Sequence, residues 1–258
     1  MEKQKGLWKI FIFSALSFII SGTVMAVAFA KNGVHPFGNQ QILVVDLWHQ
    51  YYPFFRVLRE KLLTGGSFLY SWENGMGTNF LSLISYYAMS PLNWISVFFS
   101  DENARDALTF ILVLKIGFAG GFFSYFLGYT FGRKDISITA FGILFALCSY
   151  TLGYYWNVMW FDTIALFPLV MTGVTAICRE GKWKLFTISL ALSLISNYYI
   201  GYFTCLFTVI AFAVMAICCC KGVKDCLYKL WITARSSVIG IALGGFILLP
   251  AYFGLKLT

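Results

Sequence analysis

Charged residues are scarce in this chain: Asp, Glu, Lys and Arg make up 12% of its 258 residues, against about 25% in an ordinary soluble protein. So few charges cannot cover a water-soluble surface. Hydrophobic residues account for 59%, aromatic residues for 19%, and the mean hydropathy is +0.76. The composition therefore predicts an integral membrane protein whose aromatic side chains gather at the bilayer interfaces.

Acids are fewer than bases, 11 against 19, which leaves a formal net charge of +8. A strongly basic chain can bind nucleic acid, but these bases stand in small groups at the ends of apolar runs and form no continuous stripe. Orientation in a lipid bilayer explains that placement better. No nucleic-acid partner is expected.

Several ligand-binding motifs are missing as well. The long segment 31–105 contains none of the seven cysteines, which excludes a disulfide framework there. The three cysteines at 218–220 are adjacent, and neighbours on a helix point about 100° apart, so they cannot converge on one metal ion. Gly75 and Gly77 are not followed by the Gly-Lys-Ser/Thr of a nucleotide-binding loop.

Long apolar runs predict an all-α fold, a polytopic bundle of about seven transmembrane helices. Residues 185–220 carry no charge over 36 positions, and one helix of that length would measure roughly 54 Å, longer than a bilayer core of about 30 Å. This segment is predicted to fold back at Asn197-Tyr198-Tyr199 into two short antiparallel helices. The other spans are predicted at residues 10–30, 106–131, 136–154, 163–178 and 236–253.

The first span, residues 10–30, is predicted to be a retained anchor. The sequence Ala28-Phe29-Ala30 also resembles a signal-peptidase site, so a cleaved signal peptide is the alternative. The apolar run is, however, longer than the usual signal core of about 7–15 residues.

The distribution of Lys and Arg predicts the orientation. Twelve of the 19 fall in segments 1–9, 133–134, 179–184 and 221–235. Short cytoplasmic loops hold the excess of basic residues in membrane proteins. Residues 1–9 are therefore predicted to be cytoplasmic and residues 31–105 extracytoplasmic, with six further spans in residues 106–258 of a single transmembrane domain.

The extracytoplasmic loop is predicted to contain interfacial helices. Residues 53–63 place apolar side chains on one arc and charged side chains on the other, and Gly65-Gly66 ends the pattern. Residues 79–99 are long enough for a span, but Ser90-Pro91 and Asn93 interrupt them. Two half-length interfacial or re-entrant helices are predicted there.

Two acids from distant parts of the chain are candidate catalytic residues. Asp46 begins "DLWHQYYPFF", whose aromatic residues argue against the alternative, a freely solvated loop acid. Asp162 follows "YYWNVMWF" at the outer end of a span, with no basic residue within ten positions; capping of the following helix is its alternative role. The two carboxylates are therefore expected to meet at one outer bilayer face.

An ordered set of stretches carries a family resemblance: "DLWHQYYPFF", "GGSFLYSWENGMGTNF", "YYAMSPLNWI", "WFDTIALFPLV" and "SNYYIGYF". Over nearly its whole length, the chain resembles the amino-terminal half of the bacterial YfhO family of membrane proteins. Members of that family resemble GT-C glycosyltransferases, which have many transmembrane helices, interfacial helices in the first outer loop and an acid just after the first span. The resemblance implies a GT-C-like fold in the bacterial cell membrane, and a chain that is the front part of a longer protein.

The resemblance also implies an activity. A GT-C-type enzyme takes sugar from a polyprenyl-phosphate carrier, and the family is associated with glycosylation of lipoteichoic acid or related envelope polymers in Gram-positive bacteria. Asp46 would be the general base or a ligand of a divalent cation, Mg²⁺ or Mn²⁺, and Asp162 a second acid or metal ligand. Substrate-binding roles are predicted for His49, Gln50, Tyr51, Arg56 and Trp160.

Structural roles compete for several of these residues. His49 can orient Asp46 or bind phosphate, but a lone histidine is more often structural. Arg56 and Arg59 can bind phosphate or snorkel to the interface. Lys115, the one clear charge inside a span, is expected to contact a carrier phosphate or to pair with an acid from helices beyond this chain.

Two other classes of function remain open. A lipid or polymer flippase would carry several polar groups along its spans at the membrane midplane, whereas this sequence offers one lysine there. A non-catalytic membrane scaffold is the third possibility.

Overall fold

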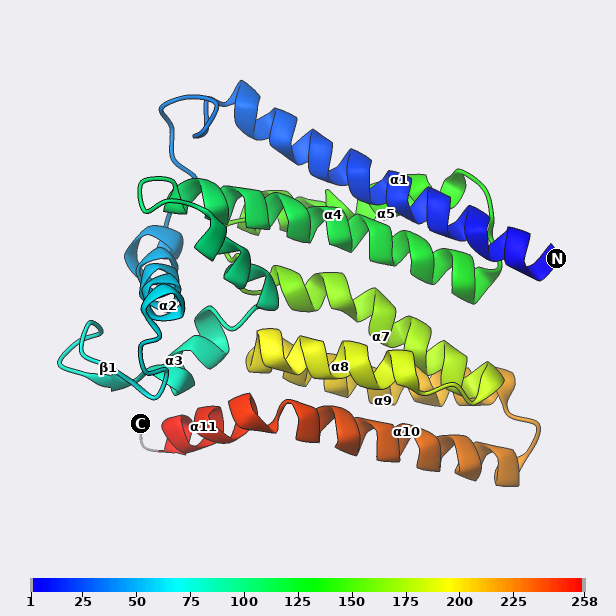
Figure 1. The fold of residues 1–258 in the computed structure, drawn as a ribbon. Helices are drawn as coiled ribbons and strands as arrows, with labels where there is room; N and C mark the ends of the chain where they lie inside the picture. The colour runs from blue at the N-terminus through cyan, green and yellow to red at the C-terminus, as the bar shows by residue number, and fades with distance from the viewer. Residues whose placement is uncertain (1, 257–258) are drawn as a thin grey trace.

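The computed structural model describes residues 2–256, with side chains from residue 6 onward. Its long helices lie side by side, and residues 32–103 gather at one end of the bundle, which we call the loop end (Figure 1). The opposite end contains the turns 132–136, 181–183 and 220–222, and we call it the basic end. The chain is an all-α polytopic bundle, as the sequence predicts.

Within residues 2–256, six helical segments are long and apolar enough to cross a membrane. Two shorter apolar helices, α8 (Lys184–Ser196) and α11 (Gly245–Lys256), complete the bundle. The six are α1 (Glu2–Lys31), α4 (Ala104–Phe131), α5 (Ser137–Ala146) continued by α6 (Ser149–Tyr154), α7 (Phe161–Glu180), α9 (Tyr198–Cys219) and α10 (Val223–Leu243).

The predicted reversal within residues 185–220 is confirmed. Asn197 separates α8 from α9, and its Oδ1 accepts a hydrogen bond from the Ile200 backbone N–H at 2.9 Å, which caps α9. Its Nδ2 donates to the Tyr86 carbonyl at 2.7 Å. The reversal is therefore tied to the loop end. The two helices are unequal, because α9 is full length and only α8 is short.

The segment 221–235 differs from its expected form as a loop before a span at 236–253. It is helical: α10 begins at Val223, and the chain bends at Gly244 before α11. Asp225 explains the early start, because its carboxylate accepts from the Lys221 backbone N–H at 2.9 Å and pairs with Lys229 one turn later at 2.8 Å. Lys224, Lys229 and Arg235 thus lie on α10, and Lys221 lies in the turn before it at the basic end.

All three basic side chains of residues 179–184 and both of residues 133–134 also lie at the basic end, as the orientation argument requires. Lys9 lies on the same end of α1. The side chains of Lys3 and Lys5 fall outside the described part. Which end faces the cytoplasm stays a prediction.

Small residues let α1, α4 and α5 pack closely. Ser17 and Ser21 of α1 are fully buried against Gly120 of α4. A Cβ on Gly142 of α5 would lie 2.6 Å from the Gly120 carbonyl and would also overlap the Ser17 hydroxyl. Such small-residue seams are how membrane helices approach each other where lipid supplies no hydrophobic drive. The buried serines here are accordingly part of helix packing.

The loop end has the predicted interfacial elements. Helix α2 (Tyr52–Thr64) lies across the end of the bundle, and Gly65 ends it in the left-handed region with φ 70° (Figure 1). A short hairpin, β1 (Tyr70–Ser71) paired antiparallel with β2 (Thr78–Asn79), leads into α3 (Phe80–Tyr87). A 3₁₀ helix, η2 (Pro91–Phe98), follows, so residues 79–99 form two short helices as predicted.

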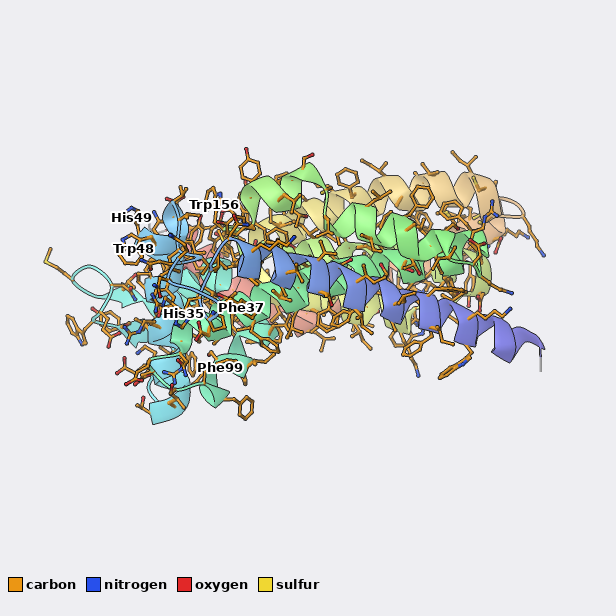
Figure 2. The ribbon with its side chains drawn as sticks, turned by 90° about the horizontal axis from the view of Figure 1, so that it is seen from above. His35, Phe37, Trp48, His49, Phe99 and Trp156 are labelled. Carbon is orange, nitrogen blue, oxygen red and sulfur yellow. The ribbon has the colours of Figure 1, made fainter. Side chains whose placement is uncertain are left out.

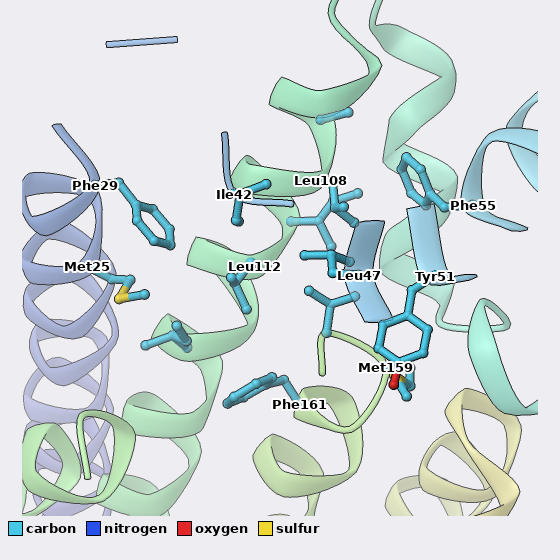
Figure 3. Packing of buried hydrophobic residues seen from close by; sticks show 14 of the residues in the cluster. Met25, Phe29, Ile42, Leu47, Tyr51, Phe55, Leu108, Leu112, Met159 and Phe161 are labelled. Atoms are coloured by element: carbon cyan, nitrogen blue, oxygen red, sulfur yellow. The ribbon is translucent and has the colours of Figure 1, made fainter. Parts of the chain in front are cut away.

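One hydrophobic cluster joins this loop to the transmembrane helices (Figure 3). Met25 and Phe29 of α1 and Leu108 and Leu112 of α4 contribute from the bundle. The loop contributes Ile42, Leu47, Tyr51 and Phe55, and the turn before α7 contributes Met159. The segment around Asp46 is therefore anchored in the protein core.

We expect Gly142→Ala to destabilise the protein by about 1–3 kcal/mol, because the new methyl group meets backbone that cannot move aside. Gly153→Ala is the matched control, since open space surrounds that glycine and alanine favours a helix. Thermal unfolding of both variants in detergent measures the difference. Equal melting temperatures for the two variants would contradict the close packing of α1, α4 and α5.

Candidate functional site

The segment that carries Asp46 has an unusual backbone. Val45, just before it, has φ 50°, a left-handed conformation that a β-branched residue rarely adopts. A short π-helix, η1 (Leu47–Tyr51), follows directly. Strained residues and π-turns both persist where surrounding structure enforces them, often at functional sites. Here Leu47 and Tyr51 are buried in the core, and this packing fixes the turn.

Asp46 itself is half-buried. The Tyr51 hydroxyl lies 3.4 Å from its Oδ2 and 3.2 Å from Oδ1 of Asn157. Burial, and secondarily the Asp46 carboxylate, raise the pKa of Tyr51 above its ordinary value, so the hydroxyl remains protonated as a donor. A contact of 3.4 Å is long for a hydroxyl donor, which leaves the Asp46 carboxylate only weakly engaged.

Asp162 has a different environment. It lies in the first turn of α7, is buried, and forms an ion pair of 2.7 Å with Lys115 of α4. Its Oδ1 accepts from the Ser90 hydroxyl at 2.6 Å, and Lys115 also donates to the Val158 carbonyl at 2.9 Å. The N-cap position of α7 is occupied by Trp160, so the alternative role of Asp162 as a helix cap is wrong.

The intramembrane Lys115 therefore pairs with an acid of this same chain, which corrects the expected partner from helices beyond it. The sequence contained the signal: an isolated lysine within one span and an isolated aspartate at the mouth of another. Two buried charges of opposite sign in a bilayer are expected to meet. Ser90, the hydroxyl donor to Asp162, had no signal beyond its place next to Pro91.

The turn between α6 and α7 connects the two acids. The Asn157 side chain meets Tyr51 on one side, and the next carbonyl, that of Val158, meets Lys115 on the other. Both acids lie at the loop end, and no hydrogen bond or ion pair joins them directly within residues 2–256. Asn157, which is almost fully buried, was not predicted from the sequence.

Two buried N–H donors near this turn have no acceptor in the part of the chain that the structure describes: Asn157 Nδ2 and Trp160 Nε1. Buried donors are normally paired, so these two are suited to an incoming oxygen. Trp160 was predicted to bind substrate. The ring of Trp156, in the same turn, stacks on the ring of Tyr51, with the ring centroids 6.3 Å apart.

The remaining predicted substrate-binding residues point outward. Figure 2 shows His49 with Trp48 and Trp156 at the loop end, and His49 is exposed. Gln50 is exposed and accepts a hydrogen bond from the Tyr87 hydroxyl at 3.3 Å. Arg56 is also exposed. Each is accessible to a ligand, and their roles stay predictions.

Arg59 differs from its neighbour, because it is buried. Its guanidinium donates to the Ser96 carbonyl at 3.0 Å, to the Phe99 carbonyl, and to the carboxylate of Asp101. These contacts join α2 to η2 and to the segment that follows. Neither phosphate binding nor snorkelling describes Arg59, whose bonds are structural.

The predicted cation ligands form no complete cage. Among the described residues, no group of three or more His, Cys, Asp or Glu side chains could hold a metal ion. Mg²⁺ commonly binds through one or two carboxylates and completes its shell with substrate phosphate and water. Asp46 fits that limited role as a single protein carboxylate.

Comparison with known proteins decides the family. A family model described as "Bacterial membrane protein YfhO" matches residues 17–258. The chain belongs to the YfhO family. No curated protein and no solved structure matches it. Family membership and the six candidate spans together make this YfhO-family chain a multi-pass membrane protein that associates with the lipid bilayer.

We expect Lys115→Met to destabilise this YfhO-family protein by about 3–5 kcal/mol, because it leaves the Asp162 carboxylate buried without a counter-charge. Asp162→Leu should have a comparable effect by isolating the ammonium group. The double variant removes both charges and should recover much of the loss. Thermal unfolding of the three variants provides the measurement, and strictly additive losses would show that the two charges are not coupled.

Proposed function

We propose that this protein is a GT-C-like glycosyltransferase that transfers sugar from a polyprenyl-phosphate donor to an envelope polymer such as lipoteichoic acid. Membership of the YfhO family supports a membrane protein related to such enzymes. The observation that carries the proposal is the setting of Asp46: a half-exposed carboxylate on a strained turn, anchored by the core at the loop end of the bundle.

The reaction requires a base at a membrane interface. In the proposed step Asp46 removes the proton of the acceptor hydroxyl, the hydroxyl oxygen forms a bond to the anomeric carbon, and the bond from that carbon to the carrier phosphate oxygen breaks. The weak contact with Tyr51 leaves the carboxylate available for the proton. The departing phosphate takes the electron pair of the broken bond.

Cationic and aromatic groups near Asp46 can assist. Arg56 and His49 are exposed in the same part of the loop and can stabilise the departing phosphate. A divalent cation bound by Asp46 and the donor phosphate would supply the same electrophilic help. Trp160 provides aromatic surface, and Gln50 provides an amide, for contacts with the sugar, whereas the predicted sugar contact Tyr51 is buried and its hydroxyl faces Asp46. Asp162, already engaged by Lys115 and Ser90, is suited to hold the site in place.

The proposed orientation puts the basic end in the cytoplasm and the loop end outside, following the excess of Lys and Arg. The sugar donor and the polymer would then meet on the outer face. Lipid transport is the alternative. Within the described spans, Lys115 and Asp162 neutralise each other near the loop end, and Arg235 of α10 lies over the Trp183 ring toward the basic end, an arrangement that offers little for moving a charged head group across the midplane.

We expect Asp46→Asn, made in the full-length protein, to lower polymer glycosylation by about 10²–10⁴-fold, the usual effect of losing a general base. Protein abundance should not change, because the amide can occupy the same space. Glu60→Gln is the matched control, an exposed acid on α2. Sugar content of the purified polymer and immunoblots of the membrane fraction provide the two measurements. Normal glycosylation in Asp46→Asn would exclude this carboxylate as the base, and altered lipid transport with unchanged sugar would favour the flippase.

A second pair of variants separates substrate binding from folding. Arg56→Met should lower glycosylation at normal abundance, since Arg56 is exposed. Arg59→Met should instead lower abundance, because the buried acceptors lose charge-assisted hydrogen bonds that contribute about 1.5–3 kcal/mol each. The same two assays distinguish the outcomes. Loss of abundance in both variants would remove the case for Arg56 as a phosphate ligand.

A further inference from the structure

One stripe of α4 is only partly covered by the neighbouring helices from Phe118 onward. It contains Lys115, Phe118, Phe122, Tyr125 and Tyr129, spaced three or four residues apart and therefore on one face of the helix. The four aromatic residues are half-buried, whereas Lys115 is buried. In Figure 1, α4 lies between α1 and the pair formed by α7 and α8. The stripe therefore faces the space between α1 on one side and α7 and α8 on the other, and we call it the floor of that space.

Three cavities follow this stripe from one end of the bundle to the other. The loop-end cavity, about 180 Å³, contacts Pro91, Lys115, Asp162 and Ser196. It shares Phe118 and Phe122 with a middle cavity of about 500 Å³. The middle cavity shares Tyr125 with a basic-end cavity of about 520 Å³. The three cavities therefore lie in series along α4, each sharing aromatic lining with the next, and we call this row of cavities the α4 furrow.

The chemistry of the furrow changes along its length. Its middle part is lined by apolar and small residues of α1 and α7, among them Phe11, Ala15 and Leu169. The Lys115–Asp162 ion pair forms a polar wall at the loop end. Lys182 and Lys184 line the basic end. An apolar ligand would thus lie along the middle, and its polar group would be at one end.

Length discriminates between lipid chains. From Lys115 to Tyr129 the floor spans 14 residues of helix, roughly 21 Å at 1.5 Å per residue. One leaflet supplies only about 15 Å, half of a core of about 30 Å. An ordinary acyl chain from one leaflet would end partway along the floor. A chain that fills the furrow must be longer than a leaflet is deep.

The loop-end cavity also adjoins the candidate site. Asp162 and Lys115 line this cavity, and Lys115 is bonded to the Val158 carbonyl in the turn whose Asn157 contacts Tyr51, the neighbour of Asp46. The polar wall is therefore shared by the furrow and the structure that supports Asp46. A lipid whose apolar chain stops at this wall would have its head group at the loop end.

We propose that the α4 furrow binds the isoprenoid chain of a polyprenyl phosphate, with the phosphate at the loop end and the chain extending toward the basic end. This assignment rests on the proposed function for its ligand class. The furrow contributes what that function alone does not specify: the helices that hold the chain, its direction, and a preference for chains longer than one leaflet.

The test is photo-crosslinking in membranes of the full-length protein, with benzoylphenylalanine placed at Phe118, Phe122, Tyr125 or, as a control, Phe207. Phe207 is an exposed phenylalanine on α9, away from the furrow. Labelled undecaprenyl phosphate should crosslink at the three furrow positions and not at Phe207. Labelled geranyl phosphate, whose chain of two isoprene units is shorter than the roughly 15 Å from Lys115 to Tyr125, should crosslink at Phe118 and fail to reach Tyr125.

Competition identifies the bound species. Excess unlabelled undecaprenyl phosphate should abolish the furrow crosslinks, and excess phosphatidylglycerol should not. Equal labelling at Phe207, or equal competition by phosphatidylglycerol, would mean bulk lipid contact only and would overturn the proposal. Labelling that is strongest at Tyr125 with the short chain would overturn the proposed direction.

A second pair of variants tests the furrow without a modified residue. Ala15→Trp fills the middle cavity and should reduce undecaprenyl phosphate crosslinking at Tyr125, while Ala213→Trp on the exposed face of α9 should leave it unchanged. Crosslinking does not require sugar transfer. If the furrow crosslinks appear but Asp46→Asn retains full glycosylation, the proposed catalytic role fails and the furrow stands. If transfer depends on Asp46 but the furrow is not labelled, the opposite holds.

Discussion

The buried ion pair between Lys115 and Asp162 is the constraint on which the loop end depends. An ammonium group or a carboxylate alone would be costly inside a bundle surrounded by hydrocarbon, so each fixes the position of the other. Their contact joins α4 to α7. Asp162 also accepts a hydrogen bond from the Ser90 hydroxyl, in the segment before η2, and Lys115 also donates to the Val158 carbonyl. The same two charged groups therefore hold two loop segments.

The position of Asp46 follows from this arrangement through packing more than through direct bonds. The turn held by Lys115 presents Asn157 to Tyr51, and Tyr51 lies four residues after Leu47 on the buried face of the π-turn. The residues on both sides of the turn are buried in the core, and this packing keeps Val45 in the left-handed region. Apolar contacts of the neighbouring residues thus set the position of Asp46, and strong hydrogen bonds to its carboxylate are not required.

Local chemistry explains which parts of the structure could be predicted from sequence. Asn197 breaks an uncharged run too long for one helix, Gly65 is compatible with a left-handed helix end, and Pro91 prevents residues 79–99 from becoming one span. The signals for these features lie within a few residues. Pairings across the chain were not accessible in the same way: nothing near Arg59 indicates that three acceptors from residues 96–101 surround it. The helix at 223–235 was missed because its charges were read as loop residues, although Asp225 and Lys229 are one helical turn apart.

The two acids illustrate a division of roles that sequence alone could not assign. Asp162 is ion-paired with the Lys115 ammonium group at 2.7 Å and accepts a hydrogen bond from the Ser90 hydroxyl at 2.6 Å, so its charge is already compensated within the protein. Asp46 accepts only the long contact from Tyr51 and is partly exposed. Burial of the first charge stabilises the frame, while incomplete burial of the second leaves its carboxylate accessible. The proposed function requires both conditions, because a base at a membrane interface must be accessible to an aqueous hydroxyl while the structure that holds it stays rigid.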